Sequence, residues 1–457
     1  MNKFLQKRAL PAAILLALLG GSGAATAVVN VQCPGDDGSN GGVAGDAIID
    51  ALPGDPNYNP NAKCMHLTAG DGFVNMSDGN PLYTFGFADK TGSAPTEAIG
   101  DGILAARWPG STIELDEGDE FYLALTNVGT VIRPDLFDPH TVHWHGFPNA
   151  ATVMDGVPEI SISINMGSTL TYYYNVVEPG TYMYHCHVEA TEHMEMGMLA
   201  NLYVHPRQDR LGIGGDVGSD GIIGTADDVV DSATAATRFG GAGPAGYVYN
   251  DDDGTTAWDV EAPLQVSSMD VNFHDASLFV QPLPFAALEA KYPMINGRGY
   301  PDTVIAGDLP PPADNSSPIM DGLVEIHPAG KITGTPGEIL NNGTPTQTLD
   351  SVITVAQGET LLLRLSNVSI DRFYTLKAQG LPMKIIGTGA RQMRGVTGKN
   401  LYRDVSSVNF GGGETHDVLI DTADVATGTY FLHAAELHQM SNLTQLDGGM
   451  ITEIVVQ

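Results

Sequence analysis

Two stretches of this chain share one pattern: residues 111–128 read STIELDEGDEFYLALTNV, and residues 351–368 read SVITVAQGETLLLRLSNV. Both alternate apolar and polar residues on either side of a central glycine, as expected for a strand, a tight turn and a second strand. The tripeptide Gly-Thr-Tyr at residues 180–182 recurs at residues 428–430, and its two copies are nearly as far apart in the chain as the two longer stretches are. We therefore predict an all-β protein with two homologous β-sandwich domains.

Histidine is concentrated in two short segments that follow the first of these stretches. The segments read His140-Thr-Val-His143-Trp-His145 and His185-Cys186-His187, and the second is followed by His193 and Met198. Side chains alternate between the two faces of a strand, so Cys186 points away from the face that carries its two neighbours. If the two segments pair in one sheet, His140 and Cys186 meet on one face, and four imidazoles meet on the other.

The two faces carry different sets of metal ligands. One face gathers two imidazoles, a thiolate and a thioether, which is the ligand set of a trigonal blue-copper electron-transfer site with a weak axial methionine. Its members are His140, Cys186, His193 and Met198, with Met196 in reserve for the axial position. The other face gathers imidazoles alone, which suit copper, zinc, iron or nickel about equally well. Its members are His143, His145, His185 and His187, and we expect copper here because a redox copper lies one residue away.

These motifs and the repeated domain pattern resemble the multicopper oxidase family, which is built from cupredoxin domains. The resemblance covers about residues 70–457 and implies two cupredoxin-like Greek-key β-sandwich domains, with a type 1 copper in the first. In that family, type 1 copper takes single electrons from a reducing substrate. The electrons pass through the cysteine and its flanking histidines to a trinuclear copper cluster, where dioxygen becomes water.

The resemblance also implies a role for each ligand. His143 looks like a type 2 copper ligand, and His145, His185 and His187 look like type 3 ligands. We expect substrate oxidation at His193, with its ring edge facing the substrate side, and electron transfer through Cys186.

The second domain departs from the family pattern. A trinuclear cluster there needs eight histidines, four from each of two facing domains, and the first domain supplies only four. The segment that we align with His140–His145 reads Gly380-Leu-Pro-Met-Lys-Ile385, and the segment aligned with His185–His187 reads His433-Ala434-Ala435. We therefore predict a second domain that lacks most copper ligands.

Three functions compete. The leading one is an oxidase that reduces dioxygen, takes electrons from a phenol, another organic donor or a metal ion, and completes its cluster in a homo-oligomer in which two copies face each other. A type 1 copper electron-transfer or copper-binding protein without oxygen chemistry would explain the second domain without an oligomer. A copper nitrite reductase analogue is disfavoured, because its mononuclear site would leave His143 and His187 superfluous.

The rest of the chain divides around the two repeats. We predict the copper-binding domain over residues 71–207 and the second domain over residues 261–457. A segment rich in Gly, Asp and Pro precedes them over residues 28–70, and an acidic Gly/Asp-rich insertion separates them over residues 208–260. Clustered carboxylates can bind calcium, but their spacing fits no EF-hand, so we favour a solvated insertion and keep calcium as the alternative.

The N-terminus predicts export. Residues 1–27 combine three basic residues, an apolar run too short to span a membrane and a small-residue end, as in a secretory signal peptide. A periplasmic or extracellular location follows, where thiols tend to be oxidised. With Cys186 assigned to copper, Cys33 and Cys64 could form a disulfide, although the sequence leaves this pairing open. The net charge of -33 argues against nucleic acid and anionic membrane surfaces as partners.

Overall fold

The computed structural model describes residues 29–148, 151–279, 282–313, 319–321, 324–326 and 339–457. The predicted signal peptide, residues 1–27, lies outside the described residues. Within the described part of the chain, no helix has the length and apolar character needed to cross a membrane.

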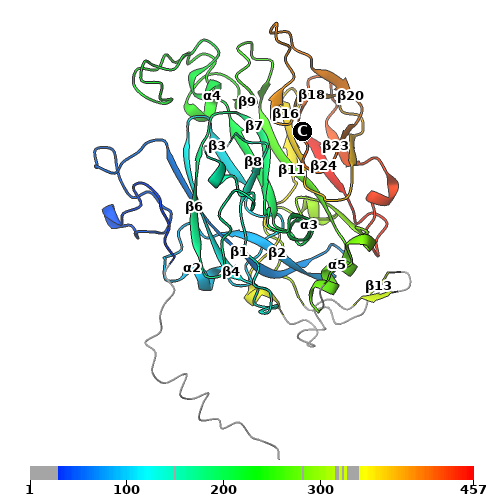
Figure 1. Ribbon diagram of the computed structural model, residues 1–457. Helices are drawn as coiled ribbons and strands as arrows, with labels where there is room; N and C mark the ends of the chain where they lie inside the picture. The colour runs from blue at the N-terminus through cyan, green and yellow to red at the C-terminus, as the bar shows by residue number, and fades with distance from the viewer. Residues whose placement is uncertain (1–28, 149–150, 280–281, 314–318, 322–323, 327–338) are drawn as a thin grey trace, which may run out of the picture.

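The first domain is a sandwich of two four-stranded sheets (Figure 1). One sheet has the order β2-β1-β4-β6 and contains β1 (Ala62–Asn75), β2 (Pro81–Asp89), β4 (Glu120–Gly129) and β6 (Thr169–Asn175). The other has the order β3-β8-β7-β5 and contains β3 (Ile113–Asp116), β5 (His143–His145), β7 (Gly180–His185) and β8 (Leu199–His205). Phe121, Leu123 and Leu125 of β4 point into the core between the sheets, because strand side chains alternate.

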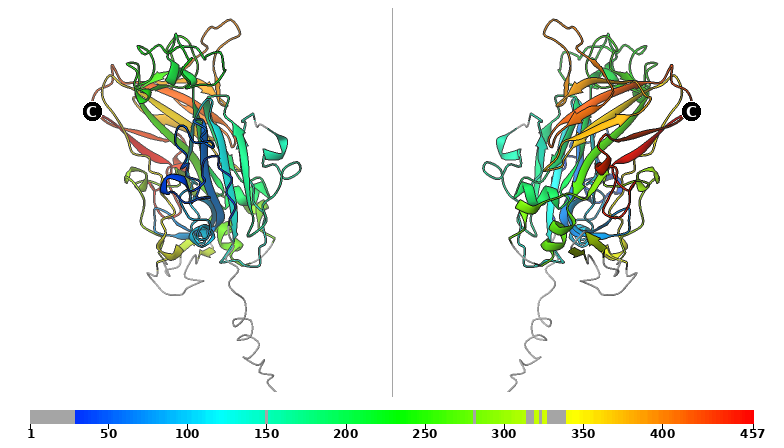
Figure 2. Two further views of the ribbon diagram at one scale, coloured as in Figure 1. Left: turned by 90° about the vertical axis from the view of Figure 1, so that its left-hand side faces the viewer. Right: turned by 90° about the vertical axis from the view of Figure 1, so that its right-hand side faces the viewer.

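The second domain repeats this arrangement with larger sheets. Its seven-stranded sheet contains β11 (Val260–Met269), β12 (Tyr292–Ile295), β16 (Thr360–Asn367), β18 (Met383–Thr388), β19 (Arg391–Gln392), β20 (Arg403–Val405) and β22 (Thr415–Asp421). Its five-stranded sheet contains β15 (Ile353–Val355), β17 (Tyr374–Ala378), β21 (Val408–Phe410), β23 (Gly428–Ala434) and β24 (Ile451–Val456). Figure 2 shows this sandwich, largely in yellow to red, beside the first in blue to green.

Short elements connect the strands. The helices are α2 (Ala98–Gly102), α3 (Ala190–Glu195), α4 (Arg207–Leu211) and α5 (Val271–Ser277). The 3-10 turns are η1 (Ser39–Gly41), η2 (Thr152–Met154), η3 (Thr237–Phe239), η4 (Phe285–Ala287), η5 (Asp302–Val304), η7 (Asn341–Gly343) and η8 (Leu437–Gln439). Two ribbons pair β9 (Gly246–Tyr247) with β10 (Ala257–Trp258), and β13 (Ile319–Asp321) with β14 (Val324–Ile326).

The repeat found in the sequence is a repeat of structure. The parallel pairs β1–β4 and β3–β8 of the first domain match the parallel pairs β11–β16 and β15–β24 of the second. At the end of the repeat, Asn127 and Asn367 each donate side-chain hydrogen bonds to backbone carbonyls and accept one from the backbone two residues later. The prediction of two homologous β-sandwiches is confirmed.

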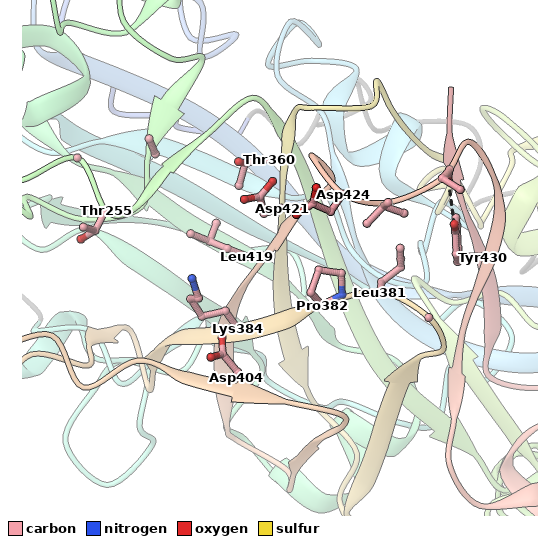
Figure 3. A pocket seen from close by; sticks show the side chains of 15 residues that line it. Thr255, Thr360, Leu381, Pro382, Lys384, Asp404, Leu419, Asp421, Asp424 and Tyr430 are labelled. Carbon is pink, nitrogen blue, oxygen red and sulfur yellow. Dashed lines mark hydrogen bonds between the residues drawn. The ribbon is translucent and has the colours of Figure 1, made fainter.

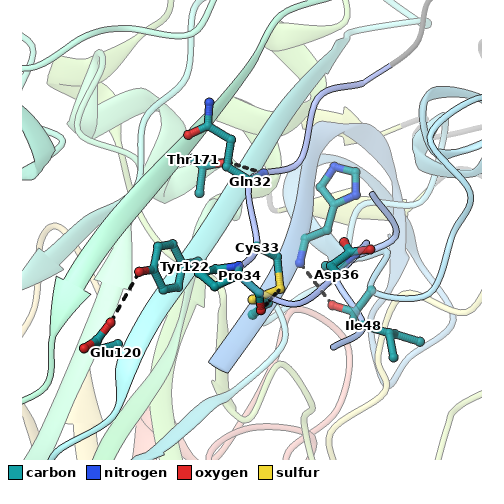
Figure 4. Close-up of a disulfide and its surroundings, with 12 residues drawn as sticks. Gln32, Cys33, Pro34, Asp36, Ile48, Glu120, Tyr122 and Thr171 are labelled. Atoms are coloured by element: carbon teal, nitrogen blue, oxygen red, sulfur yellow. Dashed lines mark hydrogen bonds between the residues drawn. A yellow bond between two sulfur atoms is a disulfide. The ribbon is translucent and has the colours of Figure 1, made fainter. Parts of the chain in front are cut away.

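The N-terminal segment is fastened to the outside of the first sandwich (Figure 4). Cys33 forms a disulfide with Cys64 of β1, so the pairing that the sequence left open is made. The backbone N–H of Gln32 donates a hydrogen bond to Thr171 Oγ1 on β6 at 3.2 Å. The predicted boundary at residue 70 therefore falls inside β1, which begins at Ala62 because its pairing with β4 starts there.

The acidic insertion over residues 208–260 is folded. It carries η3, β9 and β10, and its carboxylates act as backbone acceptors. Asp227 accepts hydrogen bonds from the backbone N–H of Ser219, and Asp251 accepts them from Gly254 and Thr256. These carboxylates stabilise turns, which is the ordinary use of aspartate in loops. Calcium binding stays the less favoured alternative for this insertion.

A buried charge network joins the two domains. Arg364 of β16 has no exposed side-chain surface and is paired with Glu261 of β11. Nη1 of the Arg364 guanidinium lies 3.5 Å from Asp417 Oδ1. The same nitrogen donates a hydrogen bond to Thr181 Oγ1 of β7 at 3.0 Å. Because β7 also carries the second histidine segment, this network holds the strand of the candidate site against the second domain.

Glu261→Gln is expected to reduce the free energy of unfolding by about 3 kcal/mol at pH 7, because Arg364 would keep a buried charge without its partner. Although burial opposes ionisation, Arg364 lowers the pKa of Glu261 to about 2. The folded pKa lies below the unfolded one, so the ionised carboxylate stabilises the fold above about pH 4.5, and this stabilisation is lost as the pH falls toward 2. Urea unfolding at pH 7 and pH 3 measures both effects.

The matched control for this change is Glu289→Gln. Glu289 is 65% exposed and pairs with Lys291 at 3.0 Å on the surface, so its loss should change stability by less than about 1 kcal/mol. Equal effects of the two substitutions would contradict a special role for the buried pair.

Candidate metal centres

The two histidine segments pair as neighbouring strands. β5 runs antiparallel to β7, with His143 opposite His185 and Trp144 opposite Tyr184. Trp144 and Tyr184 point into the hydrophobic core, so the histidines beside them point out of the sandwich. The predicted pairing of the two segments in one sheet, with two ligand sets on opposite faces, is therefore observed.

The first ligand set is buried at the edge of the core. Cys186 Sγ lies 3.2 Å from His193 Nδ1 and 4.0 Å from His140 Nδ1, and all three side chains are fully buried. The backbone N–H of Thr141 points at the same sulfur from 3.5 Å. Two imidazole nitrogens and one sulfur thus converge on one fully buried point. This ligand set contains no carboxylate and fits a blue-copper ion.

The loop from α3 to β8 brings the methionines to this set. The backbone N–H of Met198 donates to the carbonyl of His193, and the N–H of Cys186 donates to the carbonyl of Met198. The carbonyl of Met196 instead accepts from Thr84 and Phe85 on β2. Met198 is therefore held beside Cys186 and His193, which favours it over Met196 as the axial ligand, although both side chains are buried.

Cys186 and His193 of the first set shift each other's pKa values. Burial raises the pKa of Cys186, but the adjacent His193 outweighs it, and the net effect is a lowered pKa. Burial lowers the pKa of His193, but the thiolate reverses this and raises it to about 10. The pair therefore holds a proton on His193 that a metal ion would displace.

The edge of the His193 ring points at a carboxylate, and the expectation that this edge faces the substrate side stays a prediction. The ring has no exposed surface, and its Nε2 lies 3.9 Å from Asp138 Oδ2. Asp138 is 21% exposed, so this carboxylate contacts both the buried His193 ring and the solvent.

The second ligand set lies on the outer face of β5 and β7. His145 Nδ1 lies 3.3 Å from His185 Nε2, and the ring centres of His143 and His187 are 5.1 Å apart. His143, His145 and His185 each bring one nitrogen within 4.8 Å of the others. The structure therefore brings together all four imidazoles that the sequence assigned to this face.

Backbone carbonyls fix the orientation of two of these rings. His143 Nδ1 lies 2.6 Å from the carbonyl of Asp155, and His185 Nδ1 lies 2.8 Å from the carbonyl of Cys186. A carbonyl only accepts hydrogen bonds, so Nδ1 carries the hydrogen in both rings and Nε2 keeps its lone pair. Such a second partner is typical of metal-ligating histidine.

Burial disfavours the charged form of three of the four rings in the second set. Burial lowers the pKa of His143, His145 and His185, to about 3 for His185, and repulsion between the clustered rings acts in the same direction. Neutral imidazole is the form that binds metal ions, so these rings are ready to coordinate one.

The four histidines form one wall of a cavity of about 500 Å³. Residues 369–373 and 412–413 of the second domain form the opposite wall. Gly413 approaches so closely that a side-chain carbon at this position would lie 3.0 Å from the His145 ring. The residues that line this cavity from the second domain include no histidine or cysteine.

The strand register corrects our alignment of the second domain. Lys377 of β17 lies opposite His433 of β23, as His143 lies opposite His185 in the first domain. The segment equivalent to the first histidine motif is therefore Tyr374–Gln379, and the alignment with Gly380–Ile385 was wrong by one strand. β18, which pairs with β22, follows β17 closely, and sequence spacing could not separate the two.

The corrected alignment leaves the second domain equally poor in ligands. Tyr374–Gln379 contains no histidine, and alanine replaces the cysteine next to His433. His433 Nδ1 lies 2.8 Å from the carbonyl of Ala434, the same arrangement that His185 makes with Cys186. His433 is thus a structural counterpart of His185, but no group of potential metal ligands among the described residues includes it.

A larger cavity, of about 870 Å³, lies on the second domain away from both ligand sets (Figure 3). Lys384 and Asp404 come from neighbouring strands on one side, and Asp421 and Asp424 lie beside Thr360. No histidine or cysteine lines it, so it offers no site for the chemistry of the two ligand sets.

Sequence reasoning missed the groups that orient the ligands. Thr141 contacts both sets, because its N–H faces Cys186 and its hydroxyl accepts from the N–H of His187 at 3.1 Å. Asp138 stands two residues before His140, and this proximity was a usable signal. Asp155 follows β5 in a loop, and no pattern in the sequence marks it.

Known proteins match this chain in sequence over parts of both domains. Two family models, both described as multicopper oxidase, match residues 102–209 and 313–457. The chain is 39% identical to the multicopper oxidase MmcO of Mycobacterium tuberculosis over 80 residues. This aligned region is 18% of this chain and 14% of that protein. It is 28% identical to Laccase-1 of Emericella nidulans over 130 residues. This aligned region is 28% of this chain and 19% of that protein. The chain thus spans less than a fifth of the length of these curated relatives.

Solved structures share the fold. The blue copper oxidase of Nitrosomonas europaea superposes with a TM-score of 0.54 at 19% identity and covers 86% of this chain and 85% of its own. The multicopper oxidase mgLAC superposes with a TM-score of 0.53 at 17% identity and covers 86% of both chains. The predicted fold class, all-β with two cupredoxin-like Greek-key β-sandwich domains, is confirmed.

Proposed function

Since this chain belongs to the multicopper oxidase family, we propose that it is a copper-dependent oxidase that passes single electrons from a reducing substrate to dioxygen. The observation that carries the proposal is the pair of ligand sets on opposite faces of one strand, with Cys186 between His185 and His187. When bound, copper would supply one-electron oxidation at the first set and oxygen reduction at the second.

The residues of the first set would hold type 1 copper. His140, Cys186 and His193 converge on one point, and Met198, whose backbone is hydrogen-bonded to Cys186 and His193, would be the fourth ligand. The N–H of Thr141 stabilises negative charge on the sulfur, which favours the thiolate. Asp138, which contacts both the buried His193 ring and the solvent, marks the side on which we expect the electron donor to dock.

The residues of the second set would hold the type 2 and type 3 copper. His143 is assigned to type 2, and His145, His185 and His187 are assigned to type 3. One peptide unit joins Cys186 to each of two ligands of the second set, so the chain itself provides a short covalent path between the two centres.

The second set offers four of the eight imidazoles that a trinuclear cluster in this family needs, so we propose that a second copy of the chain supplies the others. Its own second domain brings no histidine to the cavity, whereas His143, His145 and His187 are partly exposed. Two first domains that face each other across a two-fold axis would contribute four imidazoles each.

The donor is a phenol, another organic reductant or a metal ion, and the protein acts in the periplasm or outside the cell. The Cys33–Cys64 disulfide supports an oxidising compartment. A second candidate function, electron transfer or copper binding without oxygen chemistry, is favoured by one observation, namely the histidine-free wall opposite the second set.

Copper analysis of the purified, copper-loaded protein, beside light scattering for its mass, tests the proposal. One type 1 ion per chain and one three-ion cluster per pair give about two and a half copper ions per chain in an even-numbered oligomer, with oxygen consumption when a donor is added. One copper ion per chain in a monomer that consumes no oxygen would establish the second candidate instead.

A further inference from the structure

A third group of metal-ligating side chains lies where the two domains meet, apart from the copper sets. His205 ends β8, Glu114 lies on β3 and Glu261 lies on β11 of the second domain. Each brings one ligand atom within 4.8 Å of the others. Neither the sequence motifs nor the proposed oxidase function uses these residues.

The orientation of His205 leaves one nitrogen free. The side chain is 2% exposed and lies between the rings of Tyr203 and Trp258. Its Nε2 lies 3.1 Å from a carboxylate oxygen of Glu261, and Arg364 keeps that carboxylate ionised. An ionised carboxylate only accepts hydrogen bonds, so Nε2 must carry the hydrogen of this contact. Nδ1 is buried and makes no hydrogen bond.

The free nitrogen points toward carboxylates. Glu114 Oε1 lies 3.7 Å from His205 Nδ1, and Asp116 Oδ1 lies 3.9 Å from it. These separations are too long for hydrogen bonds. They suit two ligands of one ion, because bonds of about 2.0–2.2 Å to a shared ion separate its ligands by about 3–4 Å.

The surroundings leave Glu114 as the available carboxylate. Asp116 is paired with Arg238, whereas no lysine or arginine among the described residues forms an ion pair with Glu114, which accepts a hydrogen bond from Tyr203 through its second oxygen. The Glu114 side chain is 56% exposed, which gives an ion a path from the solvent to the buried nitrogen. Glu261 completes a carboxylate–histidine–metal arrangement, in which a second carboxylate fixes the ring of a metal ligand.

We propose that His205 Nδ1 and Glu114 bind a divalent transition-metal ion such as zinc, with Glu261 as the carboxylate that orients His205. Mixed imidazole and carboxylate ligands suit such an ion, whereas the blue-copper set contains a thiolate. The site joins β3 and β8 of the first domain to β11 of the second, so the ion stabilises the contact between the domains.

The alternative occupant of this position is a proton. A hydrogen on His205 Nδ1 would turn the ring into a cation that Glu114, Asp116 and Glu261 surround at 3.1–3.9 Å. The two explanations differ in one measurable respect, because only the first predicts uptake of a metal ion.

Equilibrium dialysis of the copper-loaded protein against Zn²⁺ tests the proposal, since copper then occupies the other two ligand sets. We expect one tightly bound zinc ion per chain beyond the copper. Glu114→Gln should weaken this binding at least tenfold, and His205→Gln should abolish it. Zinc should also raise the melting temperature of the parent protein and leave that of His205→Gln unchanged.

The control is Glu436→Gln, which alters an exposed pair in which Glu436 lies 3.6 Å from His438 and both are 59% exposed. This variant should bind zinc as the parent does. Absence of the additional zinc ion in the parent, or equal zinc affinity in the parent and Glu114→Gln, would overturn the proposal. Glu114 is exposed, so its substitution tests the site without disturbing the core.

Discussion

We expect Cys186→Ser to abolish both the blue absorption band and oxygen consumption. The band of a blue-copper site comes from the bond between copper and a thiolate, and a serine hydroxyl cannot supply that sulfur. Cys186 is fully buried, lies 3.2 Å from His193 Nδ1 and is joined by a peptide bond to each of His185 and His187 of the second set. Visible absorption spectra and oxygen-electrode traces of the copper-loaded proteins measure both losses.

Met196→Leu is the matched control for this substitution. Met196 is buried in the same loop, but it is held by its carbonyl contacts with β2, so leucine should preserve the band. A blue band that survives Cys186→Ser would refute the assignment of the first ligand set. If the band disappears in Met196→Leu and survives in Met198→Leu, the axial ligand is Met196 and not Met198.

His143→Ala separates the two copper centres. His143 belongs to the second set and is partly exposed, so its loss leaves His140, Cys186 and His193 in place, and the blue band should persist. Oxygen consumption should fall at least about a hundredfold, because loss of a direct ligand costs more than the tenfold to hundredfold typical of outer-shell changes. Reduction of the blue band by a donor, followed without oxygen, should remain.

His438→Ala provides the comparison, since His438 is 59% exposed on the second domain and belongs to neither set. It should leave both the spectrum and oxygen consumption unchanged. Oxygen consumption that His143→Ala leaves intact would count against a cluster on this face and favour the electron-transfer function.

Much of the first domain could be predicted because its pattern is local. The alternation of side chains along β5 and β7 decides that Cys186 and His185 face opposite ways, and this needs no knowledge of the rest of the fold. The same alternation in residues 111–128 and 351–368 predicted the repeated strand pairs that the structure contains. The boundaries were less accurate, since β1 extends back to Ala62 through pairing with a strand that comes later in the chain.

The second domain could not be aligned in the same way. Its ligand motifs have disappeared, so only apolar spacing remained as a guide, and β17 and β18 look alike by that measure. The register of β17 against β23, with Lys377 opposite His433, resolves the ambiguity because backbone pairing is a property of two strands together.

The sequence by itself determined which side chains form the two candidate copper-binding sets and on which face each one lies, because residue type and strand alternation can be read from consecutive residues. Only the tertiary structure decided which nitrogens of His143 and His185 are free, that Asp138 contacts the His193 ring, and that the opposite wall of the cavity carries no histidine. It also decided that His205 meets Glu114 and Glu261. These contacts join segments that lie far apart in the chain, and no local pattern specifies which distant backbone group or side chain will pack against a given ring.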